Sequence, residues 1–451
     1  MENQKIIDMT SGSPTRLLLR FSLPMLIGNV FQQIYNLVDS VIVGQFIGKD
    51  ALGAIGATSS VTFLFFALCN GISSGGGIIA SQSFGNGDDR KVKSTLFNTA
   101  LVMLILPTLV GTAAFFLAES ILNLLETPAS FMPDALAYTQ TMCIGIVFVS
   151  VYNLVSSILR ALGDSKSPLY FLIFSCILNA GLDLLFVLPL DMGVLGAGIA
   201  TVISQFVSAA ASLIYAVATN KYFRLKKEDM KLHGRLIWDI VKLGVPLSLQ
   251  FSLIAISCMA LQHTVNTFGE TAVEAFSATS RIEQIIHQPY QTLSAALATF
   301  CGQNYGAKKN SRVIKGYHKC MGLMAVFTVI MVPLIQIFAE PIVAVFVDDD
   351  AVISMGATAM RITSLFYIAL GVIYVVRGIL NGLGDASFAL LNGIVEVIGR
   401  FTVPGLLTAI PLFGLWGIWW SVGVVWFISG FTAWLRYLVY KKKLGIVKTR
   451  N

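Results

Sequence analysis

Charged residues are scarce in this chain of 451 residues. They make up 12% of the sequence, whereas hydrophobic residues make up 55%. Ordinary soluble domains carry roughly 25% charged residues. A water-soluble core cannot hide this much apolar surface, so the composition excludes a conventional soluble protein. It indicates a protein that uses lipid as its solvent and has the bilayer as a partner.

Two further scarcities exclude other classes of protein. The six cysteines are scattered singly and form no CxxC pair, which argues against a zinc site or a disulfide framework and favours packing roles. The polar start, "MENQKIIDMTSGSPTR", lacks the pattern of a cleavable signal peptide, so we expect the first apolar run to be a retained span. The net charge of +7 comes from basic residues between apolar runs, so topology explains it better than a nucleic-acid partner.

Long apolar segments are what the sequence has in abundance. A transmembrane helix needs about 20 mostly apolar residues. Segments of this kind lie at 17–45, 52–83, 94–118, 135–159, 167–188, 194–219, 236–267, 272–304, 313–338, 353–379, 386–410 and 414–439. The sequence therefore predicts an all-α polytopic membrane protein with 12 transmembrane helices.

The loops between these segments differ sharply in charge. One set, which includes the central loop and both ends of the chain, holds nearly all of the Lys and Arg residues. The opposite set holds a single basic residue, Lys49, and is otherwise acidic. Because cytoplasmic loops carry an excess of Lys and Arg, we expect a multi-pass protein of the cell membrane with both termini in the cytoplasm.

The chain contains an internal repeat with a constant offset in residue number. Adding 221 to the numbers of three residues in the first half gives the matching positions of similar segments in the second half: Gln82 and Gln303, Gly163 and Gly384, and Gly193 and Gly414. Since six spans separate the copies, both copies enter the membrane from the same side and the repeats are parallel. We predict an N-terminal lobe (1–219), a cytoplasmic linker (220–235) and a C-terminal lobe with a basic cytoplasmic tail (236–451).

Two carboxylates lie deep inside apolar segments of the first lobe. At 1.5 Å per residue, Asp39 lies about 28 Å beyond Arg20, and Asp183 lies about 26 Å beyond Lys166, so their depths match. Tyr35 precedes Asp39 by one helical turn, and Asn179 precedes Asp183 in the same way. The two helices are therefore placed to build one polar pocket.

Acids within membrane spans are expensive and usually functional. Burial disfavours the charged form, and two close carboxyls titrate as one unit, so the pair is suited to exchange a proton. The same oxygens, with Asn179 and Thr201, are equally suited to hold Na⁺. The alternative is a structural role in hydrogen bonds between helices. Adding 221 to Asp39 and Asp183 gives Ala260 and Pro404, so the second lobe keeps the scaffold without the acids.

The second lobe carries other ionisable residues within its spans. Glu396 and Arg400 are four residues apart, and we expect them to form a neutralising ion pair. Glu283 and His287 share a helix face, where they form either a satisfied polar network or part of a cavity wall or second proton site. With no obvious third ligand they do not indicate zinc.

Two more sets complete the candidate residues. Pro24 and Pro246, which are 222 residues apart, occupy equivalent places in the two repeats with one residue of slip. They predict a kink in the first and seventh spans. Polar side chains that we expect to line a substrate cavity are Gln32, Asn36, Tyr138, Asn153, Glu283, Gln284 and His287.

The six-plus-six arrangement, the basic middle loop and the paired "LGD" turns make the chain resemble the multidrug and toxic compound extrusion (MATE) family. Within the first lobe, its polar set is similar to that of the DinF-like bacterial and archaeal branch: Pro24, Tyr35, Asp39, Asn179, Asp183 and Thr201. The resemblance implies a V-shaped transporter that exports organic cations or other amphipathic compounds, driven by H⁺ or Na⁺. NorM-type and eukaryotic relatives carry acids in the seventh and tenth spans. In this chain the corresponding segments "PLSLQFSLIAISCMALQHTVNTF" (246–268) and "TSLFYIALGVIYVVRGIL" (363–380) carry none.

These observations predict a secondary active antiporter that exports amphipathic, cationic compounds by alternating access, without a cofactor and as a monomer. The alternative is a flippase for a lipid-linked or other amphiphilic precursor. Such a flippase usually needs a cationic cavity, for which Arg281, Arg361 and Arg400 are the candidates. An enzyme is not expected, because the loops are short and hold no cluster of catalytic residues.

Overall fold

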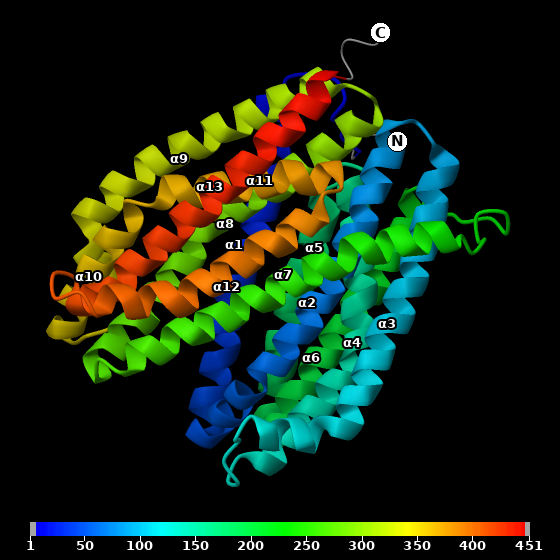
Figure 1. Cartoon of the computed structure of the whole chain (residues 1–451). Coiled ribbons are helices and arrows are strands. Elements are labelled where there is room, and N and C mark those ends of the chain that lie inside the picture. The colour runs from blue at the N-terminus through cyan, green and yellow to red at the C-terminus, as the bar shows by residue number, and fades with distance from the viewer. Residues whose placement is uncertain (1–5, 447–451) are drawn as a thin grey trace. The chain divides into compact units, whose positions relative to one another are not determined.

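The computed structural model describes residues 6–446, and every regular element in that range is helical. Lys5 and the last residues of the predicted basic tail, 447–451, lie outside this range. Lipid offers no hydrogen bonds to the main chain, so a spanning segment must satisfy its own N–H and C=O groups, as a helix does. Figure 1 shows long helices throughout.

The helices of the first half are α1 (Pro14–Ile42), which runs into a π-helical turn η1 (Val43–Ile47), α2 (Lys49–Gly85), α3 (Asp89–Leu124), α4 (Met132–Ala161), α5 (Lys166–Val187) and α6 (Gly193–Thr219). Those of the second half are α7 (Gly234–Asn266), α8 (Glu270–Gly306), α9 (Asn310–Ala344), α10 (Asp350–Ser364), α11 (Tyr367–Leu383), α12 (Ala386–Thr408), the short 3₁₀ turn η2 (Gly414–Trp416) and α13 (Gly417–Ile446).

The number of clear membrane spans is slightly lower than the predicted twelve. Among the described residues, ten helices are long and apolar enough to cross a membrane, and α10 with α11 adds an eleventh if the bent pair is one span. The helix expected at 272–304 is present as α8, with 37 residues, but it does not reach the same apolar character. The reason is visible in its sequence, because Glu270, Glu274, Arg281 and Glu283 crowd its first four turns.

The tenth predicted span is broken rather than straight. The axes of α10 and α11 differ by 54°. At the break, the side-chain amide of Gln336 on α9 donates to the carbonyl of Arg361 at 2.8 Å and to Ser364 Oγ at 2.9 Å. A side chain that enters the main-chain ladder in this way is a known cause of kinks. The sequence pattern of α10 and α11 could not reveal it, because the intruding group comes from another helix.

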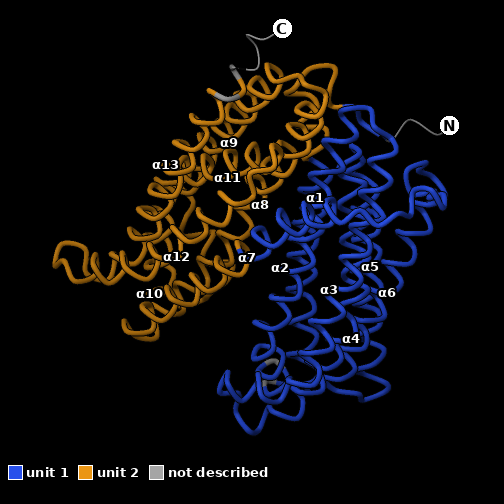
Figure 2. The backbone as a smooth tube through the Cα atoms, turned by 45° about the vertical axis from the view of Figure 1, so that its right-hand side comes forward, with its two compact units in different colours: residues 1–8, 23–249 blue, residues 9–22, 250–451 orange. Residues whose placement is uncertain are grey.

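The helices form two compact units, coloured separately in Figure 2. The first unit contains described residues 6–8 and 23–249, and the second contains 9–22 and 250–446. The predicted lobes met at the linker 220–235, so two segments are assigned differently. Residues 9–22 belong to the second unit, and the start of α7 up to Leu249 belongs to the first.

Close helix packing explains why the start of α7 belongs to the first unit. A Cβ atom added to Gly75 of α2 would lie 2.7 Å from the main-chain nitrogen of Gly244 on α7, so the two backbones meet with no room for side chains. Ile240, one turn earlier on α7, is fully buried in the core of the first unit.

Hydrogen bonds explain why the N-terminal segment belongs to the second unit. The Met9 N–H donates to Gln303 Oε1 at 2.9 Å, and the Met9 carbonyl accepts from Asn304 Nδ2 at 3.0 Å and from Arg312 Nη2 at 3.1 Å. The Met9 side chain is fully buried. The first helix therefore starts from a point that α8 and α9 fix.

The predicted linker is fastened along the start of α3. Asn98 on α3 bridges two linker residues, because its Nδ2 donates to the Lys231 carbonyl at 3.1 Å and its Oδ1 accepts from the His233 N–H at 3.1 Å. Lys93 and Asp229 add an ion pair at 3.4 Å. The Asn98 side chain is fully buried, so the linker cannot leave without exposing its amide.

We expect Asn98→Ala to loosen the linker. It removes two hydrogen bonds, each worth about 1 kcal/mol, so local opening should rise by on the order of 10-fold. Limited trypsin digestion at the linker lysines and arginines measures that opening. Lys93→Ala is the matched control, since it removes a partly exposed ion pair of smaller value. Equal cleavage of wild type and Asn98→Ala would contradict the role of Asn98.

Candidate functional site

Two carboxyl groups face each other inside the first unit. Asp39 on α1 and Asp183 on α5 lie close enough to interact electrostatically. The Asp183 side chain is fully buried, and that of Asp39 is partly buried. The two residues that the sequence placed at one depth therefore also share one position across the helix bundle.

This carboxyl pair needs a positive charge between its two groups, either a proton or a bound cation. Neither oxygen of Asp183 receives a hydrogen from any donor group in the described part of the chain. A carboxylate can only accept, so a hydrogen bond between two carboxyls requires a proton on one of them. Two ionised carboxylates at this spacing would repel each other in a poorly solvated site. The pair is therefore built to hold a proton or a bound cation.

Tyr35 and Asn179 lie one turn before the two acids on the same helices. The Tyr35 hydroxyl donates to Asn179 Oδ1 and links α1 to α5 a second time. Asn179 is buried, and its Nδ2 has no partner among the described residues. An unsatisfied buried donor is costly, so this amide is available to a group that enters the pocket.

Tyr138 on α4 and Thr201 on α6 form the remaining wall. They are hydrogen-bonded to each other, and the Tyr138 ring stands close enough to Asp39 and Asp183 to interact with both electrostatically. The Thr201 hydroxyl also donates to the Ala197 carbonyl at 3.0 Å. The structure places Tyr138 beside the carboxyl pair, and its predicted place in a substrate cavity remains a prediction.

Three other polar residues of the first unit lie outside this pocket. Asn153 is buried on α4, about 22 Å along the helix from Tyr138, and its Nδ2 donates to the Val149 carbonyl at 2.8 Å. Asn36 is exposed, and Gln32 is partly exposed. Their predicted place in a substrate cavity remains a prediction.

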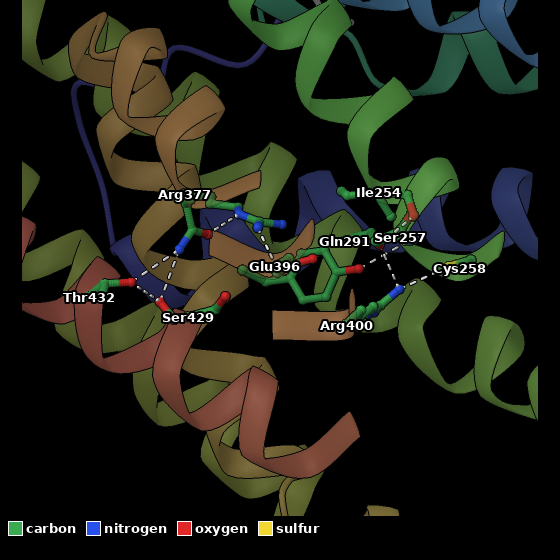
Figure 3. A network of polar contacts seen from close by, with 11 residues as sticks. Ile254, Ser257, Cys258, Gln291, Arg377, Glu396, Arg400, Ser429 and Thr432 are labelled. Atoms are coloured by element: carbon green, nitrogen blue, oxygen red, sulfur yellow. Dashed lines mark hydrogen bonds and ion pairs between the residues drawn. The ribbon is translucent and has the colours of Figure 1, made fainter. Parts of the chain in front are cut away.

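The ion pair of the second unit differs from the predicted one. Glu396 on α12 pairs with Arg377 on α11, with Oε1 and Nη2 2.5 Å apart, and the side chains of Arg377 and Glu396 are only 8% and 5% exposed. No ion pair between Glu396 and Arg400 is present in the described part of the chain. Figure 3 shows Arg377 and Glu396 side by side, with Arg400 turned toward Ser257 and Cys258.

A second anchor explains why Arg377 is the partner. Its Nε donates to Asn392 Oδ1 at 2.7 Å, and Asn392 lies one turn before Glu396 on α12. One guanidinium thus bridges both residues of a single helix face. Asn392 Nδ2 in turn donates to the Ser429 carbonyl at 3.0 Å, which ties α13 into the network.

Glu283 and His287 of α8 are placed near Arg400. The Glu283 side chain is hydrogen-bonded to Thr363, and both Glu283 and His287 interact electrostatically with Arg400. His287 packs edge-on against Trp426, with ring centres 5.5 Å apart, and its Nε2 is buried without a partner among the described residues. Gln284, also predicted to line a cavity, is exposed.

Sequence reasoning missed Arg377, Asn392 and Trp426 as members of this network. A signal for Arg377 was present, because an arginine inside the apolar run "IYVVRGIL" needs a counter-ion within reach. Nothing in the sequence singled out Asn392 or Trp426, since their roles depend on which faces of α12 and α13 turn inward.

The two predicted kink residues lie where their helices change unit. Pro24 follows the boundary between Ser22 and Leu23 in α1, and Pro246 lies just before the boundary after Leu249 in α7. Each proline removes one main-chain donor from its helix.

Comparisons with known proteins agree with this architecture. The MatE family profile matches residues 24–185 and 246–402. The two matched segments begin at the equivalent prolines Pro24 and Pro246, which is an independent sign of the internal repeat. The "Probable multidrug resistance protein YpnP" of Bacillus subtilis is 32% identical over 439 residues, which cover 96% of this chain and 97% of that protein. The "Multidrug export protein MepA" of Staphylococcus saprophyticus is 23% identical and covers 99% of each chain.

Solved structures support the same fold. A crystal structure of MATE in complex with MaL6 matches 98% of this chain and 100% of that one, with a TM-score of 0.93 at 21% identity. An outward-facing multidrug resistance MATE family transporter of the MOP superfamily matches 98% of this chain and 99% of that one, with a TM-score of 0.92 at 21% identity. With the helical membrane fold and the repeat, these matches give one conclusion: the chain belongs to the MatE family and is a multi-pass membrane transporter, not an enzyme.

Proposed function

We propose that this protein is a secondary active antiporter of the DinF-like branch that exports amphipathic, cationic organic compounds in exchange for H⁺ or Na⁺. The observation that carries this proposal is the pair of interacting carboxyls Asp39 and Asp183, in which the buried Asp183 has no donor partner among the described residues. A proton or a bound cation would offset the repulsion between the two groups. The names of the relatives YpnP and MepA, which refer to multidrug resistance and multidrug export, support the class of substrate.

In this proposal the pair couples ion binding to drug release. A coupling ion that enters from outside lowers the negative charge of the pocket, which weakens its attraction for a cationic drug. Release of the ion to the cytoplasm restores that charge and the affinity. Coupling of this kind is reciprocal, so the drug must also weaken binding of the ion. Alternating access then moves the two in opposite directions.

Na⁺ and H⁺ would use the same groups in different ways. A proton would sit between Asp39 and Asp183. A sodium ion would need more oxygen ligands than the pair supplies, with the Thr201 hydroxyl as the nearby candidate. We further propose that the chain works as a monomer, with both termini in the cytoplasm, as the charges of its loops predict.

Gradient-driven transport in proteoliposomes tests the proposal. A proton gradient and a sodium gradient are imposed separately, and movement of the fluorescent cation ethidium is recorded. We expect wild type to move ethidium under one of the two gradients and Asp39→Asn to lose that response. Asp134→Asn is the matched control, because Asp134 is an exposed acid at the start of α4.

Two results would contradict the proposal. Normal coupling by Asp39→Asn would make the carboxyl pair structural. No movement of ethidium by wild type under either gradient would argue against multidrug export, and a flippase for an amphiphilic precursor would then be the better proposal.

A further inference from the structure

Arg400 is a cation within a membrane-spanning helix that has no carboxylate bound to it. Glu396 is taken by Arg377 at 2.5 Å, and Glu283 is bonded to Thr363. No ion pair to Arg400 occurs in the described part of the chain. An unpaired guanidinium in a poorly solvated place costs free energy that a binding site can recover from a ligand.

The guanidinium of Arg400 is held by hydrogen bonds from Nη1, while its buried Nε makes none within the described part of the chain. Its Nη1 donates to Ser257 Oγ at 3.1 Å and to Cys258 Sγ at 2.9 Å, both on α7, which fixes the plane of the group (Figure 3). Its Nε is buried and has no hydrogen-bond partner among the described residues. The edge formed by Nε and Nη2 is a pair of parallel N–H donors, the geometry that binds a carboxylate through both oxygens.

The internal repeat provides a second, independent observation about Arg400. Subtracting 221 from Arg400 gives Asn179, which stands beside the carboxyl pair of the first unit. Adding 221 to Asp39 and Asp183 gives Ala260 and Pro404. These three repeat positions therefore carry two acids and an amide in the first unit, and one cation and no acid in the second.

The surroundings of Arg400 favour an organic anion over a small inorganic one. His287, with which Arg400 interacts electrostatically, packs against Tyr374 with 6.5 Å between ring centres, and both residues are partly exposed. Aromatic rings provide contact surface for a flat apolar group. The other ionisable groups that act on Arg400 are Cys258, Tyr374, Glu283 and Glu396, and the two acids already have partners.

We infer that Arg400 is a substrate-binding residue that receives the anionic group, foremost a carboxylate, of zwitterionic amphipathic compounds. This inference rests on the proposed export function and narrows its substrate class. The carboxylate of such a compound lies on the Nε–Nη2 edge of Arg400. A zwitterion should therefore bind more tightly than the same molecule with its carboxylate masked.

Two dyes that differ only in this group provide the test. Rhodamine B carries a free carboxylate beside its cationic ring system, and its ethyl ester lacks that negative charge. Binding to the purified protein in detergent is measured by fluorescence anisotropy. We expect Arg400→Gln to weaken rhodamine B binding on the order of 10-fold to 100-fold, the value of a charge-assisted hydrogen-bonded pair, and to change ester binding less than about threefold.

Control variants separate recognition from folding. Arg400→Lys keeps the charge but loses the two-pronged edge, so an intermediate loss of rhodamine B binding is expected even if Arg400→Gln proves unstable. Arg361→Gln removes an arginine that pairs with Glu340 at a partly exposed place, and both dyes should bind it as they bind wild type.

The inference is overturned if Arg400→Gln, or Arg400→Lys in its place, weakens both dyes equally or weakens neither. It is also overturned if wild type binds the ester at least as tightly as rhodamine B. Failure of the export proposal would appear elsewhere, as an absence of gradient-driven ethidium transport. The dye comparison needs no gradient, so the two failures are distinguishable.

Discussion

Replacement of Glu396 by Leu should destabilise the protein by about 3–5 kcal/mol, the usual cost of leaving one buried charge without its partner. The Arg377 side chain, which is 8% exposed, would remain buried with its Nη2 facing an apolar side chain. In a unit of this size such a loss lowers the apparent melting temperature on the order of 10 °C. Heating the detergent-solubilised protein and measuring the fraction that stays unaggregated gives that temperature.

The matched control for Glu396→Leu is the double variant Arg377→Met with Glu396→Leu. Removal of both charges avoids the unpaired cation and should restore most of the stability. Recovery should be incomplete, because Asn392 Oδ1 loses its donor at a cost of about 1–3 kcal/mol. A double variant less stable than Glu396→Leu alone would show that the ion pair is not the reason for the loss.

The mistaken partner of Glu396 shows what a helical period can and cannot decide. Spacing along one helix correctly places Glu396 and Arg400 on neighbouring positions of α12. It does not say which neighbouring helix offers a better partner. Arg377 on α11 reaches two side chains of α12 at once, whereas Arg400 turns toward α7. Composition and periodicity therefore predicted the helices and their polar positions, but not the pairing across helices.

The same limit explains the successes and gaps elsewhere in the fold. The helical membrane fold and the repeat follow from apolar length and from similar segments that recur at a constant offset, which are properties of the chain itself. The family came from the resemblance of its motifs. The break between α10 and α11 depends on Gln336, a residue of α9. The assignment of residues 9–22 to the second unit depends on Asn304 and Arg312, which lie in the other half of the sequence.

The carboxyl pair shows how far depth alone can carry a site prediction. Counting residues from Arg20 and Lys166 placed Asp39 and Asp183 at the same depth in the membrane. Depth alone does not say whether two side chains lie side by side. Their contact needed the direction of each side chain around its helix, and Tyr35 and Asn179 supply that register by linking α1 to α5.

Asp39→Asn, Asp183→Asn and the double variant should all lose gradient-driven drug accumulation to the same extent. For a one-for-one exchange, a proton gradient of two pH units provides about 2.7 kcal/mol, which supports roughly 100-fold accumulation. The same holds for a 100-fold sodium gradient if Na⁺ is the coupling ion. Because the two carboxyls share one proton or one cation, loss of either should abolish coupling, and loss of the second should add nothing.

Exchange of labelled for unlabelled ethidium, with no ion gradient, is the control for these three variants. It needs a folded carrier that binds and carries drug but no ion coupling, so variants that retain exchange while losing accumulation are decoupled rather than misfolded. Two independent sites would give a different pattern: each single variant would keep part of the accumulation, and only the double variant would lose all of it. That additive result would mean that Asp39 and Asp183 touch in the structure without acting as one site.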